Sequence, residues 1–158
     1  MTEVDSYTGV MNLSEGYVSH SFNQFVKTTD NNVTTRFGDV HPNDWYAAAV
    51  KWCADNGVVT GYTGTNKFGP DDMVTREQLA AMSGRYCQKV KGMDSAGKDV
   101  SQFKDGASVS EWARDGVAFC ASHGIVSGIG STGNFASQGN ATRCQMSKII
   151  AVTAYMLK

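Results

Sequence analysis

Two arginines follow threonine in the same short pattern, Thr-Arg-x-Gln, which begins at Thr75 and again at Thr142. A threonine followed three positions later by glutamine is typical of a capping box, in which each side chain bonds the other residue's free backbone N–H at a helix start. Capping does not explain Arg76 or Arg143, because a cation in the first helical turn opposes the helix dipole. A guanidinium beside free helix N–H groups can bind a carboxylate or a phosphate, and a solvated arginine or an ordinary salt bridge is the alternative. The predicted capping residues are Thr75, Gln78, Thr142 and Gln145.

The arginine pattern belongs to a longer duplication. Twelve residues between Trp45 and Gln78 recur 67 positions later, between Trp112 and Gln145, and the two stretches align without a gap. Upstream, the stretches FGDV (residues 37–40) and FKDG (residues 103–106) also correspond. We therefore expect two repeats, at residues 37–90 and 103–158, joined by a polar linker at residues 91–102. Residues 1–36 match neither copy.

Within each repeat the apolar spacing predicts a helix, a loop and a second helix. The intervening stretch VVTGYTGTNKFGPDD is rich in glycine and predicts short extended pieces and a turn. Two helices per repeat cannot bury both faces alone, so the repeats must pack on one another, on the N-terminal region or on a partner chain. The expected fold is mainly α, with helix-loop-helix repeats packed as a pseudo-symmetric helical bundle. The expected stripe of the first helix in repeat 1 is Trp45, Ala49, Trp52, Cys53 and Asn56.

The N-terminal segment, residues 1–36, has two interpretations. Val18, Phe22, Phe25 and Thr29 follow helical spacing, which predicts an amphipathic helix over residues 15–29 that completes the bundle. Alternatively, the segment forms a few strands or associates with another chain or a copy of itself, because aromatic residues are common at interfaces.

Composition excludes several classes of protein. The chain has 158 residues, 41% of them hydrophobic, which is enough for a globular core. With 14 basic and 15 acidic residues the net charge is −1, and neither sign forms a long block, so a nucleic-acid-binding surface is not indicated. No apolar run approaches the length of a membrane span, and no secretion signal is visible in this chain.

An enzyme is not expected either. His20, His41 and His123 stand in unlike contexts, and no nucleophile elbow or phosphate-binding glycine loop occurs. Asp71 and Asp72 precede a helix, where carboxylates usually stabilise the dipole. The sequence predicts no cofactor and no metal site.

The four cysteines show no zinc-binding spacing. Cys53 and Cys120 are equivalent positions on the first helices, where a buried free thiol is expected. Cys87 and Cys144 are not equivalent, so symmetric disulfides within the repeats are excluded. A bridge between Cys53 and Cys87 is geometrically possible, and Cys144 is expected to be exposed.

Four motifs occur in the same order in both copies, Phe-x-Asp, Trp, a Gly-Ile/Val-Val-x-Gly stretch and Thr-Arg, and the first copy also has Gly-x-x-x-Phe before its Thr-Arg. They lie in FGDVHPNDWYAAAVKWCADNGVVTGYTGTNKFGPDDMVTREQLAAM and FKDGASVSEWARDGVAFCASHGIVSGIGSTGNFASQGNATRCQM. Over residues 37–156 the chain resembles a pair of S-layer homology (SLH) repeats. The resemblance implies non-covalent anchoring at the bacterial cell surface, through secondary cell-wall polysaccharides that often carry ketal-linked pyruvate. It implies that Arg76 and Arg143 contribute to the sugar-binding groove, where a pyruvyl carboxylate is a suitable anion.

The resemblance adds two further pairs of candidate glycan-binding residues. Trp45 and Trp112 match the family's tryptophan, which either packs on a sugar face or lies in the core. Asp39 and Asp105 match the aspartate of the Phe-x-Asp motif, and either role, accepting sugar hydroxyls or tying down a loop, fits a carboxylate.

The chain also departs from the family. Gln78 and Gln145 replace the usual acidic residue after Thr-Arg, and the loop of the second copy lacks the proline of the first. SLH repeats usually come in threes, arranged as a pseudo-threefold spindle, whereas two full copies are present here. These departures support a rival hypothesis, an SLH-like protein-interaction or self-assembly module that has lost glycan binding.

Overall fold

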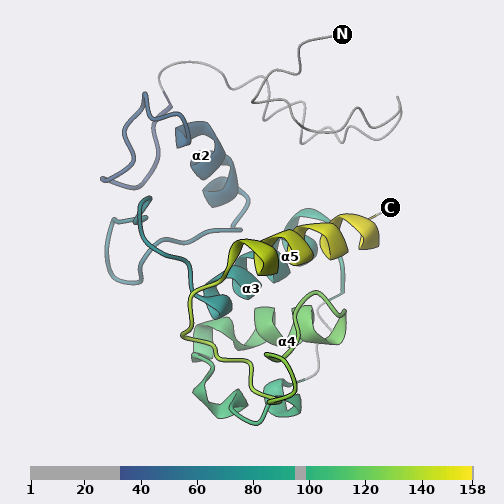
Figure 1. Ribbon diagram of the computed structural model, residues 1–158. Coiled ribbons are helices and arrows are strands. Elements are labelled where there is room, and N and C mark those ends of the chain that lie inside the picture. Colours follow the sequence, from purple (N-terminus) through teal and green to yellow (C-terminus); the bar gives the residue numbers. More distant parts are fainter. Residues whose placement is uncertain (1–32, 95–98, 158) are drawn as a thin grey trace, which may run out of the picture.

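The computed structural model describes residues 33–94 and 99–157 (Figure 1). Within them no strand forms, and an isolated antiparallel bridge joins Thr75 to Asn140. The mainly helical fold class predicted from the sequence is confirmed, while the predicted helix at residues 15–29 lies outside the described residues. The elements are α2 (Ala47–Asp55), α3 (Arg76–Arg85), the π-helical turn η1 (Tyr86–Val90), the 3-10 turns η2 (Val100–Gln102), η3 (Gly106–Ser108) and η4 (Glu111–Ala113), α4 (Arg114–Ser122) and α5 (Arg143–Met156).

The main core joins the two repeats, because α3 of repeat 1 packs against α4 of repeat 2. Glycines allow the two backbones to approach closely: a Cβ atom at Gly116 of α4 would lie 2.6 Å from the Cα of Ala81 in α3. The thiol of Cys120 also donates to the carbonyl of Ala80 at 3.3 Å. Figure 1 shows α3, α4 and α5 as one group, with α2 beside them. Repeat 1 therefore contributes its second helix to the core of repeat 2.

The loop of repeat 2 closes this core. Phe103 and Phe135, which are distant in the sequence, lie with ring centroids 5.1 Å apart. Phe119 and Ile125 are fully buried beside them. The corresponding rings of repeat 1, Phe37 and Phe68, lie 5.4 Å apart and belong to a second, smaller cluster.

Helix α2 differs from α4, its counterpart in repeat 2. Among the described residues no other helix packs extensively against α2, and its buried residues are Ala47 and Val50. The predicted stripe is therefore wrong: its middle residues, Ala49, Trp52 and Cys53, are only half-buried, Trp45 precedes the helix and is 78% exposed, and Asn56 is exposed. Apolar spacing carried the predicted stripe back to Trp45, which lies before the first turn of α2 and therefore does not share a helical face with the residues of α2.

The cysteines are all free thiols, and the possible bridge between Cys53 and Cys87 is not formed. Cys87 and Cys120 are fully buried, and burial raises the pKa of Cys120 to about 12, so its thiol stays protonated at neutral pH. Cys144 is exposed, as predicted.

Two classes of feature are missing from the part of the chain that the structure describes. None of its helices combines the length and the apolar character needed to cross a bilayer. No group of three or more His, Cys, Asp or Glu side chains there has an arrangement that could hold a metal ion.

Candidate functional site

Both second helices begin with a complete capping box. In α3 the hydroxyl of Thr75 accepts from the N–H of Gln78 at 3.3 Å, and the Gln78 side chain accepts from the N–H of Thr75 at 2.9 Å. In α5 the same two bonds join Thr142 and Gln145 at 3.4 and 3.1 Å. The boxes fix the backbone just before each arginine.

The side chain of Arg76 crosses from repeat 1 into repeat 2. Its Nε donates to the carbonyl of Phe135 at 2.7 Å, and one terminal nitrogen donates to the carbonyl of Ser127 at 2.9 Å. The guanidinium carbon lies 4.9 Å from the centroid of the Phe135 ring, at cation–π distance. Partial burial lowers the pKa of Arg76, and the nearby carboxylate of Asp105 opposes this shift. A guanidinium has five N–H donors, so donors remain for a ligand.

Backbone hydrogen bonds add to the contact between the first turn of α3 and the loop of repeat 2. We call this contact the joint between the repeats. The N–H groups of Arg76 and Glu77, in the first turn of α3, donate to the carbonyls of Gly139 and Ser137 at 2.8 and 3.1 Å. These first-turn groups have no acceptor within their own helix, so the loop of repeat 2 satisfies them.

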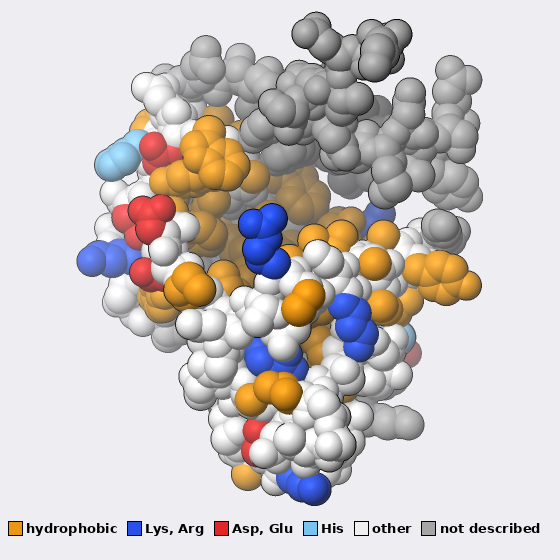
Figure 2. All heavy atoms as spheres, viewed as in Figure 1, with side chains coloured by type: hydrophobic (Ala, Val, Ile, Leu, Met, Phe, Trp, Pro, Cys, Tyr) orange, Lys and Arg blue, Asp and Glu red, His pale blue; other side chains and the backbone are white. Residues whose placement is uncertain are grey.

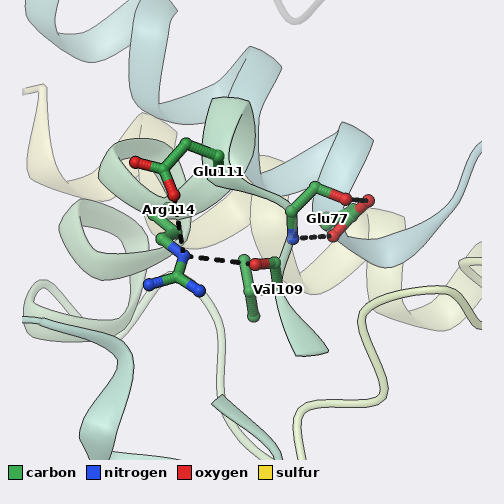
Figure 3. Close-up of polar contacts among 5 residues, drawn as sticks. Glu77, Val109, Glu111 and Arg114 are labelled. Carbon is green, nitrogen blue, oxygen red and sulfur yellow. Dashed lines mark hydrogen bonds and ion pairs between the residues drawn. The ribbon is translucent and has the colours of Figure 1, made fainter. Parts of the chain in front are cut away.

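The side chain of Glu77 adds further hydrogen bonds between the repeats. Its side chain comes from α3 and lies against the segment that leads into α4, close to the contacts of Arg114 with Glu111 and the carbonyl of Val109 (Figure 3). Glu77 is only 2% exposed. Its carboxylate accepts the N–H and hydroxyl of Ser110 at 3.0 and 2.8 Å and the side-chain amide of Gln138 at 2.8 Å. Three donors replace the water that this buried charge has lost.

A groove of about 160 Å³ lies beside Arg76, between the loop of repeat 2 and α5. Lys148 of α5 extends to this loop and donates to the hydroxyl of Ser127 at 3.1 Å. Figure 2 shows cationic side chains on this face of the molecule over α5, with hydrophobic side chains around them. Among the described residues no acidic side chain lines the groove, and the charged side chains that do are Arg76 and Lys148. The lining residues are Arg76, Ile125, Val126, Ser127, Gly128, Ile129, Gly130, Gln145, Lys148 and Ile149.

A family comparison agrees with the repeats that the geometry shows. The model of the S-layer homology domain matches residues 36–80 and 102–147, together more than half of the chain. This chain belongs to the S-layer homology family.

SLH repeats of similar sequence occur in several large proteins. The chain is 36% identical over 121 residues to an amylopullulanase of Thermoanaerobacterium thermosulfurigenes, covering 77% of this chain and 6% of that protein. It is 34% identical over 114 residues to the exoglucanase XynX of Acetivibrio thermocellus, with coverage of 72% and 10%. It is 27% identical over 106 residues to the surface-layer 125 kDa protein of Lysinibacillus sphaericus, with coverage of 66% and 8%. The chain thus spans a tenth or less of the length of these relatives. No solved structure gives a significant match.

The aspartates of the two SLH repeats hold their own loops. Asp39 accepts from the N–H groups of Phe68 and Gly69 at 2.8 and 2.9 Å. Asp105 accepts from those of Phe135 and Ala136 at 2.6 and 2.8 Å. Of the two roles left open by the sequence, these contacts correspond to tying down a loop.

The same hydrogen bonds change the acidity of both aspartates. Donation from the backbone N–H groups of Phe68 and Gly69 lowers the pKa of Asp39. For Asp105, partial burial acts to raise the pKa, but donation from Phe135 and Ala136, together with nearby Arg76, outweighs it and the pKa is lowered. Both side chains are therefore carboxylates at neutral pH.

The remaining predicted residues lie apart from the groove. Trp45 and Trp112 are 78% and 50% exposed, so neither is a core residue, and neither lines the groove. Arg143 is exposed, and within residues 33–94 and 99–157 its guanidinium makes no hydrogen bond or ion pair. Of the six candidate glycan-binding residues, the structure brings only Arg76 to the groove, with Asp105 nearby.

Sequence reasoning missed Glu77 and Lys148. Glu77 was hidden because its equivalent in repeat 2 is Cys144, so a search for shared residues passes over it. Lys148 has Ala81 as its equivalent and belongs to no motif. The available sequence indication was the charge difference between the two copies at these positions.

Proposed function

We propose that this chain is a non-catalytic SLH module that holds a larger protein on the bacterial cell surface by binding an anionic cell-wall polysaccharide. The observation that carries the proposal is the charge of the groove, which is lined by Arg76 and Lys148 and, within residues 33–94 and 99–157, by no acidic residue. A ketal-linked pyruvyl group presents a carboxylate, for which a guanidinium and an ammonium are suitable partners. The names of relatives, which include a surface-layer protein and a cell surface glycoprotein, support an extracellular location.

The groove also has the mixed lining that a sugar requires. Val126, Ile129 and Ile149 offer aliphatic surface to the C–H face of a sugar ring, while Gln145 and the free donors of Arg76 offer polar contacts. Arg76 is held in place by its bonds to repeat 2, so little conformational entropy is lost when it meets an anion.

Outside the groove, we propose smaller contributions from other predicted residues. Trp45 and Trp112 have exposed rings on which further sugar units can stack. Arg143 offers a second guanidinium with free donors. Asp39 and Asp105 act indirectly, by shaping the loops.

The test uses calorimetry with purified cell-wall polysaccharide, with and without its pyruvyl groups. Lys148→Ala is the cleanest variant, because Lys148 is exposed and its loss leaves the repeat joint intact. We expect about tenfold weaker binding, as for one charge-assisted hydrogen bond, and a decrease of wild-type affinity with salt. Lys104→Ala, an exposed lysine of repeat 2 outside the groove, is the matched control and should bind like the wild type.

A folded wild type that binds neither form of the polysaccharide would refute the proposal and favour the assembly module. One observation already supports that rival: the guanidinium of Arg76 bonds two backbone carbonyls, so its presence is explained by packing of the repeats alone. Equal binding by Lys148→Ala and the wild type would place the anion site elsewhere.

A further inference from the structure

The joint between the repeats has two halves, a donor half and an acceptor half. The donor half is the first turn of α3, with the guanidinium of Arg76 and the N–H groups of residues 76 and 77. The acceptor half is the loop of repeat 2, with the carbonyls of Ser127, Phe135, Ser137 and Gly139. Because the chain is a duplication, each half occurs a second time.

The second donor half, at the start of α5, is open. Arg143 is exposed, and neither its guanidinium nor the N–H groups of residues 143 and 144 donate to any residue in 33–94 or 99–157. The capping box of Thr142 and Gln145 holds this turn in the same conformation as the start of α3. The donors are thus in place without acceptors among the described residues.

The second acceptor half, in the loop of repeat 1, is open as well. Asp39 and the ring pair of Phe37 with Phe68 hold this loop as Asp105 and Phe103 hold the other. The equivalent carbonyls accept no hydrogen bond from the residues that the structure describes; they belong to Thr60, Phe68, Pro70 and Asp72.

The residues before repeat 1 in this sequence do not supply the arginine that fits this loop. Residues 1–32 contain no arginine. Arg36 donates to the neighbouring carbonyl of Val59 at 3.2 Å and lies over the Phe37 ring, which leaves the carbonyls of Thr60 and Phe68 open. We propose that a second copy of this chain docks head to tail, with its Arg143 on the loop of repeat 1. The two open halves are complementary because the equivalent arginine and loop carbonyls already form the joint inside the chain.

The docked copy would also complete a second groove. In repeat 2 the groove needs both the loop and an arginine from the preceding repeat. The loop of repeat 1 has the equivalent Gly61 and Thr60, and Arg143 of the second copy supplies the missing cation. The proposal concerns protein association and holds whether or not the groove binds a polysaccharide.

This contact is weaker than the joint inside the chain. Cys144 stands where Glu77 makes its buried bonds, and the close pair of Ala81 with Gly116 is replaced by Lys148 with Ala49. The helix packing is therefore not reproduced, and the contact is confined to the loop and the first turn. We expect a dissociation constant of roughly 0.1 mM, as for small reversible interfaces.

The test uses two variants of the full chain that each block one half. Arg143→Glu removes the donor, and Thr60→Arg places a cation on the acceptor loop; both side chains are exposed, so the fold should persist by circular dichroism. In sedimentation equilibrium without polysaccharide, we expect the average mass of the wild type to rise between about 10 µM and 1 mM. Each variant alone should remain a monomer, while an equimolar mixture should form a 1:1 dimer, because it restores one joint and no more.

Arg114→Ala is the control, an exposed arginine of repeat 2 away from both halves, and it should associate like the wild type. A wild type that stays monomeric at every concentration would overturn the proposal and assign the open halves to another repeat or to residues 1–32. Association that survives Arg143→Glu, or a mixture that remains monomeric, would overturn it too.

Discussion

Arg76 and Arg143 occupy the same place in two copies of one sequence, yet only Arg76 is built into the fold. Both follow a capping threonine at the start of a second helix. Arg76 bonds two carbonyls of the following repeat, whereas Arg143 has no such loop among the described residues. The difference shows that the role of this arginine is set by the repeat that comes after it. The shared Thr-Arg motif thus predicts where the arginine lies at the helix start, whereas the contacts of the arginine depend on the neighbouring repeat.

The largest difference between the copies should appear at Glu77 and its equivalent, Cys144. Glu77→Ala removes a buried acceptor of three hydrogen bonds and strands the N–H of Ser110, so we expect a loss of about 3 kcal/mol in the free energy of unfolding. Cys144→Ala, at an exposed site, should change it by less than about 0.5 kcal/mol. Urea denaturation of both variants measures the contrast. Equal losses would mean that the joint is not what stabilises repeat 2.

A smaller contrast is expected between the two arginines themselves. Arg76→Ala removes two hydrogen bonds from a charged donor and the contact with the Phe135 ring, which should cost about 2 kcal/mol. Arg143→Ala should be neutral within about 0.5 kcal/mol at protein concentrations where the chain is a monomer. Thermal unfolding monitored by circular dichroism compares them, and a large effect of Arg143→Ala in the monomer would mean that Arg143 also stabilises the fold of a single chain.

The smallest effects are expected at Asp39 and Asp105, which make equivalent hydrogen bonds in the loops of the two repeats. Asp39→Asn and Asp105→Asn should each destabilise the fold at pH 7, by less than Arg76→Ala does, because a carboxamide satisfies only part of the paired N–H donors. The folded pKa of each aspartate lies below its usual value, so the stabilisation is present above about pH 4 and is lost as pH falls through the folded pKa. Urea denaturation from pH 7 down to pH 3 should show the wild type approaching the Asn variants. A constant gap at every pH would exclude this origin.

The duplication and the capping boxes were predictable because both depend on residues close together in the sequence. Thr75 and Gln78 lie one helical turn apart, and the glycines of the loops recur at fixed spacing. The joint was not predictable, because its acceptors are backbone carbonyls, which every residue carries. No residue type at Ser127 or Phe135 indicates that the carbonyl there receives an arginine from the other repeat.

The exposure of Trp45 shows a second limit. Helical spacing placed Trp45 on an apolar face, but α2 begins at Ala47, and Trp45 lies in the turn that precedes it, where its side chain is exposed. Helix boundaries depend on the first-turn hydrogen bonds, and apolar periodicity does not record them. Lys148 was missed for a related reason, since its place in the groove follows from the packing of α5 beside the loop of repeat 2.

A surface anchor must also resist being pulled. The start of α5 is tied to the start of α3 by the bridge between Thr75 and Asn140, which includes the bond from the N–H of Ala141 to the carbonyl of Val74 at 2.9 Å. Tension applied to α5 would be shared with α3 through this bridge and through the bond from the Gln138 amide to the carboxylate of Glu77. We therefore expect the contact between the two repeats to be the part of the module that resists a pulling force.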